Sequence, residues 1–296
     1  MAPSRADPSI ADAVRNGDAA VVPLHEAEAL IWSGGGPEEL EAALAGAPDV
    51  SWVQLPSAGI ERYSRLIDGR RVWTCAKGIY AQPVAEHALS LALAGMHRLP
   101  HFARAHTWQK VDYQDLHGSA VTIVGGGGIT AALLELLAPF HTSTTVVRRH
   151  PRAMDGADRV VGTSELREAL KEADVVVLTL ALTAETEGII GEQELRAMKP
   201  GAWLVNVARG KLIDTNALVD ALRDGRIGGA ALDVTDPEPL PDDHPLWGLD
   251  NCLITPHCAN PPSYEREQYA ALVRDNVRRR IAHESLAGII DPLLGY

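Results

Sequence analysis

The chain has 296 residues, of which 46% are hydrophobic and 22% are charged, a globular composition with room for about two domains of roughly 150 residues. A net charge of −12 disfavours nucleic acid as a partner, and no apolar stretch reaches the roughly 18 residues of a membrane span. The three cysteines suggest neither disulfides nor a metal site, and the N-terminus shows no signal-peptide pattern. These features predict a cytoplasmic protein that binds no membrane and no metal.

The first hundred residues alternate short apolar runs with helical patterns. Strands are predicted over 19–24, 29–33, 50–57 and 71–76, and a helix over 37–47, where Pro37 occupies the first turn. Residues 82–99 predict a helix that is apolar nearly all round and therefore buried.

Residues 101–118 have no clear periodicity and are rich in His and Trp. Such a segment cannot fold on itself, so we expect an arm that packs Trp108 and Tyr113 against a second copy of the chain. The sequence thus predicts a homodimer.

From residue 120 onward, strand and helix patterns alternate strictly. The predicted strands are 120–125, 144–149, 174–180, 202–208, 228–234 and 251–255, and the helices are 129–138, 164–173, 191–198, 214–224 and finally 262–285. Nearly continuous apolar strands are typical of a parallel sheet covered on both faces. This pattern predicts an α/β fold with a doubly wound sheet.

A glycine-rich turn, VGGGGIT (124–130), joins the first of these strands to its helix, in the order that a dinucleotide site requires. Gly125 is expected to make the tight turn, and Gly127, Gly128 and Ile129 to approach a pyrophosphate at the helix N-terminus. Counting from Gly125 puts Thr130 at the position of the third glycine, which predicts that the helix stands slightly off the strand.

The next strand ends in arginines where NAD sites usually carry a carboxylate for the ribose. Arg148 takes that position, and Arg149 and Arg152 follow. Guanidinium groups suit a 2′-phosphate rather than a 2′-hydroxyl. The cluster therefore favours NADP(H), with NAD(H) as the other possible cofactor.

Three polar residues follow later strands, at the sheet edge where ligands bind in open α/β folds: Arg209, Glu238 and His257. With VAEHALSLALA (84–94), the glycine turn, VNVARGKLID (205–214), LDVTDPEPL (232–240) and ITPHCAN (254–260), the sequence resembles the D-2-hydroxyacid dehydrogenase family. The resemblance runs in order from about residue 50 to residue 280.

The resemblance implies a catalytic role for each of these three residues. Arg209 would bind the substrate carboxylate and polarise its 2-keto oxygen. His257 would exchange a proton with that oxygen, and Glu238 would orient the imidazole and favour its protonated form. The implied reaction transfers a hydride from NADPH, or NADH, to a small 2-oxo acid and yields the D-2-hydroxy acid.

The resemblance also implies further contacts and a domain division. Ala208 and Asp233 would contact the cofactor, and backbone amides of Ser57, Ala58, Gly59, Ala76, Lys77 and Gly78 the substrate carboxylate. A flavodoxin-like substrate domain, residues 1–98 and 263–296, would receive the Rossmann domain, residues 99–262, as an insertion.

Two alternatives stay open at this point. The first is an NAD-dependent, phosphoglycerate dehydrogenase-like enzyme, which Arg148 disfavours. The second is a non-catalytic, nucleotide-sensing interaction protein on the same fold. The complete set of Arg209, Glu238 and His257 favours an enzyme over the non-catalytic alternative. The sequence favours a glyoxylate/hydroxypyruvate reductase-like enzyme without naming its 2-oxo acid.

Overall fold

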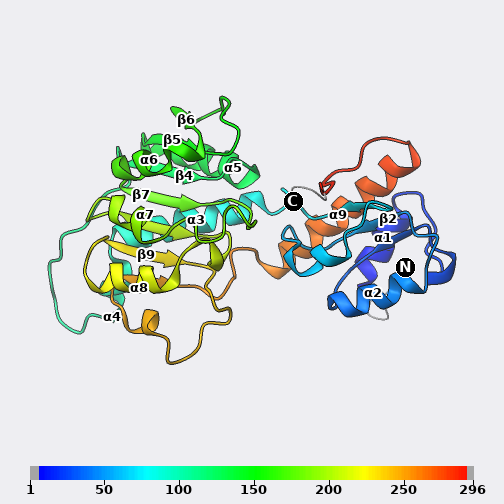
Figure 1. The fold of residues 1–296 in the computed structure, drawn as a ribbon, viewed down its shortest axis with the longest axis horizontal. Helices are drawn as coiled ribbons and strands as arrows, with labels where there is room; N and C mark the ends of the chain where they lie inside the picture. The colour runs from blue at the N-terminus through cyan, green and yellow to red at the C-terminus, as the bar shows by residue number, and fades with distance from the viewer. Residues whose placement is uncertain (1–6, 292–296) are drawn as a thin grey trace. The chain divides into compact units, whose positions relative to one another are not determined.

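The computed structural model describes residues 7–291 and contains two compact units (Figure 1). The described parts of Met1–Tyr80 and Pro261–Tyr296 form unit 1, and Ala81–Asn260 forms unit 2. The outermost residues of the predicted substrate domain, 1–6 and 292–296, lie outside the described residues.

Unit 2 is built on a seven-stranded parallel sheet in the order β10-β9-β8-β7-β4-β5-β6. Its strands are β4 (Ala120–Val124), β5 (Ser143–Val147), β6 (Arg159–Val161), β7 (Val175–Leu178), β8 (Trp203–Asn206), β9 (Gly229–Leu232) and β10 (Cys252–Ile254). All strands are parallel, and the order in which they are added to the sheet reverses between β4 and β7. Doubly wound sheets bind dinucleotides at this switch point. The six predicted strands are present, and β6 is an additional edge strand.

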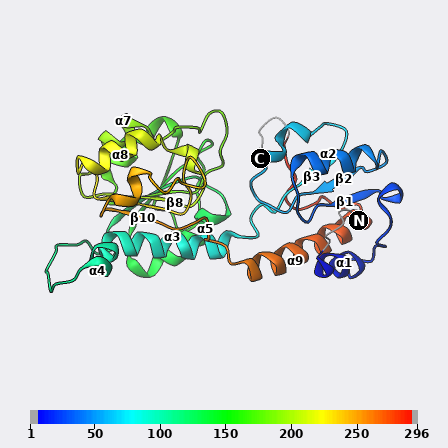
Figure 2. The same ribbon diagram turned by 90° about the horizontal axis from the view of Figure 1, so that it is seen from below.

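Helices cover both faces of this sheet (Figure 2). α3 (Ala81–Met96) and α5 (Gly128–Leu137) pack together on one face, and α6 (Leu166–Glu172), α7 (Glu192–Ala197) and α8 (Thr215–Arg223) pack on the other. Both faces are therefore buried, which explains why the strands are apolar along their whole length.

The helix predicted over 82–99 belongs to unit 2. α3 packs on α5 and β8, and at Gly95 it approaches Trp203 so closely that a Cβ would overlap the indole. The units consequently divide at 80/81 and 260/261, whereas the sequence suggested 98/99 and 262/263. α3 is apolar because it packs between α5 and one face of the unit 2 sheet.

Unit 1 has a three-stranded parallel sheet, in the order β1-β2-β3, between two helical layers. The elements are α1 (Pro8–Arg15), β1 (Ala29–Ile31), α2 (Pro37–Ala45), β2 (Trp52–Gln54), β3 (Val72–Thr74) and α9 (Pro262–Ile281). α1 and α9 cover one face and α2 the other. Both units thus have the predicted α/β class, with helices on both faces of parallel strands.

In unit 1, one predicted strand is absent and one helix was not predicted. Residues 19–24 form no strand, and Pro23 there has no amide to donate to a sheet. The helix α1 was not predicted, although Asp7 caps it by accepting a 2.9 Å bond from the Ser9 amide and Pro8 starts it.

The segment after α3 leaves the body of unit 2. α4 (Leu99–Arg104) is followed by residues 105–118 without helix or strand, and this stretch extends away from the sheet (Figure 2). Trp108 is 98% exposed on it. Over residues 7–291, none of the helices combines the length and apolar character that crossing a bilayer would need.

Candidate active site

The three predicted catalytic side chains follow three neighbouring strands of unit 2. Arg209 comes after β8, Glu238 after β9 and His257 after β10. Because the strands are parallel, their carboxyl ends meet at one edge of the sheet. His257 Nδ1 lies 2.6 Å from Glu238 Oε1, so the structure brings together two residues that are 19 positions apart.

The backbone holds His257 in a defined position. Its φ of 51° lies in the left-handed region, and its amide donates to the carbonyl oxygens of Asp233, at 2.8 Å, and Thr255, at 3.0 Å. The side chain itself stays open to solvent, with 51% of its surface exposed. A rigid backbone with an accessible imidazole suits proton exchange with a bound molecule.

Arg209 is positioned by a turn that Asn206 closes. The buried Asn206 amide donates to the Arg209 carbonyl oxygen at 2.8 Å and accepts from the Ala208 amide at 3.0 Å. Gly210 then abuts the Thr235 carbonyl, where no Cβ would fit. Ala208 and Arg209 therefore leave β8 along a fixed path. No sequence pattern points to this role of Asn206.

Asp233, at the end of β9, is buried in a cluster of donors. It accepts from the Thr255 hydroxyl at 2.6 Å and from the amides of Cys258 and Ala259 at 2.9 and 3.1 Å, and His87 Nε2 lies 3.2 Å away. Burial raises the pKa of Asp233, but the bonds from His87, Thr255 and the two amides outweigh it and lower the pKa to about 2. This carboxylate is ionised at neutral pH.

The glycine turn has the features that a pyrophosphate site requires. Gly125 has a φ of 126° and abuts Thr179, so only glycine fits, whereas a Cβ on Gly127 would meet open space. Gly127 is the N-cap of the ten-residue helix α5, which begins at Gly128 and continues through Ile129. The exposed amides at this helix N-terminus suit an anion.

Thr130 fits its position despite replacing a glycine. The residue is fully buried, its hydroxyl donates to the Gly125 carbonyl oxygen at 3.1 Å, and it lies 2.9 Å from the Thr179 hydroxyl. The hydroxyl thereby ties the turn to the end of β7. The sequence does not indicate these hydrogen bonds, which hold the start of α5 to the turn.

The arginines after β5 lie beside the glycine turn. The Arg148 side chain passes over Gly126, close enough to contact a Cβ there. Arg149 pairs with Glu185 at 3.2 Å, and both side chains are largely exposed. The sequence did not suggest Glu185, which adds a negative charge to an otherwise basic site.

The two predicted substrate loops lie together in unit 1. They follow the neighbouring strands β2 and β3, and the Ala76 amide donates to the Ser57 carbonyl oxygen at 3.1 Å. That amide, one of the predicted substrate donors, is therefore already satisfied. Ala58, Lys77 and Gly78 are exposed, Gly59 is half buried, and Gly78 has a φ of 86°.

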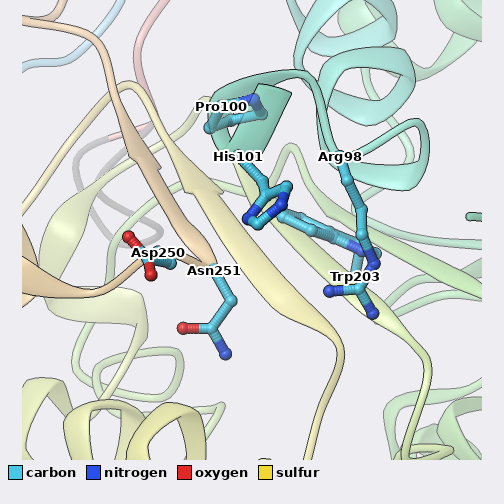
Figure 3. Close-up of a pocket in the computed structure, with 6 residues that line it drawn as sticks. All are labelled: Arg98, Pro100, His101, Trp203, Asp250 and Asn251. Atoms are coloured by element: carbon cyan, nitrogen blue, oxygen red, sulfur yellow. The ribbon is translucent and has the colours of Figure 1, made fainter. Parts of the chain in front are cut away.

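A separate small pocket lies at the amino ends of the unit 2 strands, opposite the ends that carry the predicted catalytic residues (Figure 3). Arg98 and His101 lie beside Trp203, the first residue of β8, and Asp250 and Asn251 line the other side. The pocket is thus at the base of the arm and does not include Arg209, Glu238 or His257.

A family model decides the relationship to known proteins. The D-isomer specific 2-hydroxyacid dehydrogenase NAD-binding domain matches residues 87–259, which is more than half of the chain. The chain belongs to this family. It is an NAD(P)-dependent oxidoreductase on the Rossmann fold, as the sequence predicted.

Individual relatives are similar to this chain over different lengths. An uncharacterized protein from Corynebacterium melassecola is 40% identical, over 92% of this chain and 91% of its own. A glyoxylate reductase from Pyrococcus furiosus is 35% identical over 67% of this chain. The match covers 62% of that reductase, less than two thirds of its length.

Solved structures of this dehydrogenase family have the same fold. A family member from Xanthobacter autotrophicus Py2, in complex with NADPH and MES, superposes with a TM-score of 0.86 and 28% identity over 100% of this chain and 98% of its own. A family member from Aeromonas salmonicida is 33% identical with a TM-score of 0.78, over 95% and 88% of the two chains.

Proposed function

We propose that this dehydrogenase reduces a small 2-oxo acid to the D-2-hydroxy acid and prefers NADPH to NADH. The observation that carries the proposal is the 2.6 Å pair of His257 and Glu238 at the sheet edge where Arg209 also emerges. In carbonyl reduction, an acid/base group supplies the proton to the carbonyl oxygen, and a cation stabilises the negative charge that develops on this oxygen.

Each of the three side chains has a distinct role in this proposal. The guanidinium of Arg209 binds the substrate carboxylate and stabilises negative charge developing on the 2-keto oxygen. His257, protonated at both ring nitrogens, donates the Nε2 proton to that oxygen while Nδ1 stays bonded to Glu238. Glu238 orients the ring and stabilises its positive charge.

The residues of unit 2 fit a nicotinamide dinucleotide. The N-terminus of α5 would hold the pyrophosphate, and Asp233 would accept a hydrogen bond from the nicotinamide amide. Ala208 would line the same site. NAD(P)H supplies the hydride when bound.

The preference for NADPH depends on Arg148 and Arg149. A 2′-phosphate next to Arg148 would gain charged hydrogen bonds of about 1.5–3 kcal/mol each, less where solvent screens them. The NADPH bound to the Xanthobacter relative supports this assignment. We expect Arg148→Asp to invert the preference, as measured by kcat/KM for both cofactors. Equal values in the unmodified enzyme would contradict the proposal.

The substrate class rests on the same chemistry. A planar carboxylate next to a ketone suits the fork of donors on the Arg209 guanidinium. The glyoxylate reductases among the relatives support a substrate of this size. Oxidation of NADPH and NADH at 340 nm with glyoxylate, hydroxypyruvate and pyruvate tests this. No turnover with any of them, in an enzyme that binds NADPH, would refute it and favour a nucleotide-sensing role.

We also propose that unit 1 is the substrate domain, that unit 2 is the cofactor domain, and that the enzyme is a homodimer. The dimer proposal is supported by the exposed apolar side chains of Leu99, Phe102, Trp108 and Tyr113 on α4 and the arm. A second copy of the chain that covers these side chains would explain why apolar residues stand at the surface of this segment. A monomer in light scattering at micromolar concentration would contradict it.

A further inference from the structure

Three side chains with different metal-ligating atoms meet beside the proposed acid/base pair: His87 on α3, Asp233 after β9 and Cys258 after β10. One ligand atom of each lies within 4.8 Å of the others. They come from three elements far apart in sequence, so no spacing rule finds them. The sequence by itself accordingly predicts no metal site.

We propose that His87, Asp233 and Cys258 bind a divalent zinc-class cation. An imidazole nitrogen, a carboxylate oxygen and a thiolate are the three ligand types that Zn²⁺ takes in proteins, and water commonly completes the tetrahedron. The presence of sulfur favours Zn²⁺ or Co²⁺ over Mg²⁺ or Ca²⁺, which prefer oxygen ligands.

The existing distances are close to those of a metal site. Ligand atoms about 2.0–2.3 Å from a tetrahedral zinc lie about 3.3–3.6 Å from each other, and His87 Nε2 is 3.2 Å from Asp233 Oδ1. Cys258 is exposed, so a rotation of its side chain can bring the sulfur toward this pair. Binding therefore requires that the cation replace the His87 contact with Asp233 and that the Cys258 side chain turn toward this pair.

The proton balance of binding is simple. His87 Nε2 faces two oxygens, Asp233 Oδ1 and the Thr255 hydroxyl, and the hydroxyl hydrogen already points to Asp233. Nε2 therefore carries a proton. On binding, the Nε2 proton passes through solvent to Nδ1 of the same ring, which leaves the Nε2 lone pair for the cation, and the Cys258 thiol releases its proton to solvent.

A cation at this site would compete with the cofactor, an inference that rests on the proposed function. If Asp233 accepts the nicotinamide amide, a cation on Asp233 competes with the cofactor. Zn²⁺ would then inhibit reduction competitively with NADPH, without contacting His257 or Arg209.

Titration of the purified, full-length, cofactor-free protein with Co²⁺ tests the site directly. A thiolate bound to Co²⁺ gives a charge-transfer band in the near ultraviolet, and a tetrahedral site gives strong visible bands. We expect both at a stoichiometry of one per chain, and their loss on addition of Zn²⁺. Cys75 and Cys252 are buried, so Cys258→Ser should abolish the thiolate band.

A matched pair of histidine variants locates the nitrogen ligand. His87→Gln should weaken Co²⁺ binding at least about 10-fold, since even outer-shell changes commonly cost that much. His97→Gln, ten residues further on, should leave binding unchanged. Absence of a thiolate band in the unmodified protein, or a band that survives Cys258→Ser, would overturn the proposal.

Addition of NADPH separates this proposal from the proposed function. Loss of the Co²⁺ bands as NADPH binds supports competition at Asp233. Bands that persist in the NADPH complex would keep the metal site and refute the role of Asp233 toward nicotinamide.

Discussion

Two carboxylates at the same edge of the unit 2 sheet have opposite surroundings. Glu238 is 43% exposed and meets one partner, His257. Asp233 is 2% exposed and meets four donors from two segments, α3 and the residues that follow β10. An exposed carboxylate with one partner can stabilise a group that exchanges protons with a bound molecule. A buried carboxylate that accepts from several donors stays ionised and fixes the conformation of the segments that donate to it. The comparison distinguishes a carboxylate beside a group that exchanges protons from a carboxylate whose position and charge are fixed by its neighbours.

Removing the exposed imidazole should have the largest effect on activity. His257→Ala removes the general acid, so we expect kcat for reduction to fall by about 10²–10⁴. The free energy of unfolding should change little, because the ring is half exposed. Steady-state kinetics and urea unfolding measure the two effects, with His106→Ala on the arm as the control. Near-normal kcat would contradict the assigned role.

Removing the buried charge should act mainly on stability. Asp233→Asn turns an amide NH₂ toward existing donors, and we expect it to cost about 2 kcal/mol of unfolding free energy at pH 7. The pKa of Asp233 is lowered from 3.8 to about 2. Its contribution is therefore present above pH 4 and is lost as pH falls toward 2.

Urea unfolding at several pH values measures this contribution. The difference in unfolding free energy between Asp233→Asn and the unmodified chain should narrow between pH 4 and pH 2. Glu238→Gln, at the exposed carboxylate, should cost less unfolding free energy than Asp233→Asn at pH 7. A pH-independent cost for Asp233→Asn would indicate that its charge is not what the cluster stabilises.

Replacing the exposed carboxylate should slow reduction less than removing the imidazole does. Glu238→Gln keeps a hydrogen-bond acceptor for His257 Nδ1 but removes the negative charge beside the ring. We expect kcat for reduction to fall by up to about 10-fold, which is less than the loss expected for His257→Ala. Steady-state kinetics of the two variants at the same pH measures this. A kcat equal to that of the unmodified enzyme would refute the role of the pairing.

The smallest effect is expected at the exposed ion pair of Arg149 and Glu185. Surface pairs contribute about 0–1 kcal/mol, so Glu185→Gln, which frees Arg149 for a phosphate, should raise kcat/KM for NADPH by about 2- to 5-fold. The value for NADH should not change. Glu187→Gln, two residues away and also exposed, is the control. An equal gain with both cofactors would contradict a phosphate contact.

Local patterns in the sequence were sufficient for much of unit 2. The strands are apolar because both faces are covered, and glycines mark the turn, so β4, α5 and the edge carrying Arg209, Glu238 and His257 could be predicted. Unit 1 was less predictable. Its strands are only three residues long, and short apolar runs such as residues 19–24 can be extended without joining a sheet.

Contacts between distant segments could be decided only by the tertiary structure. The assignment of α3 to unit 2 depends on Gly95 meeting Trp203, and the fit of Thr130 depends on Thr179, 49 residues away. The meeting of His87, Asp233 and Cys258 likewise comes from packing. Sequence periodicity reports which faces are buried and where strands end, because these are local properties. Which side chain meets which partner depends on the packing of whole elements.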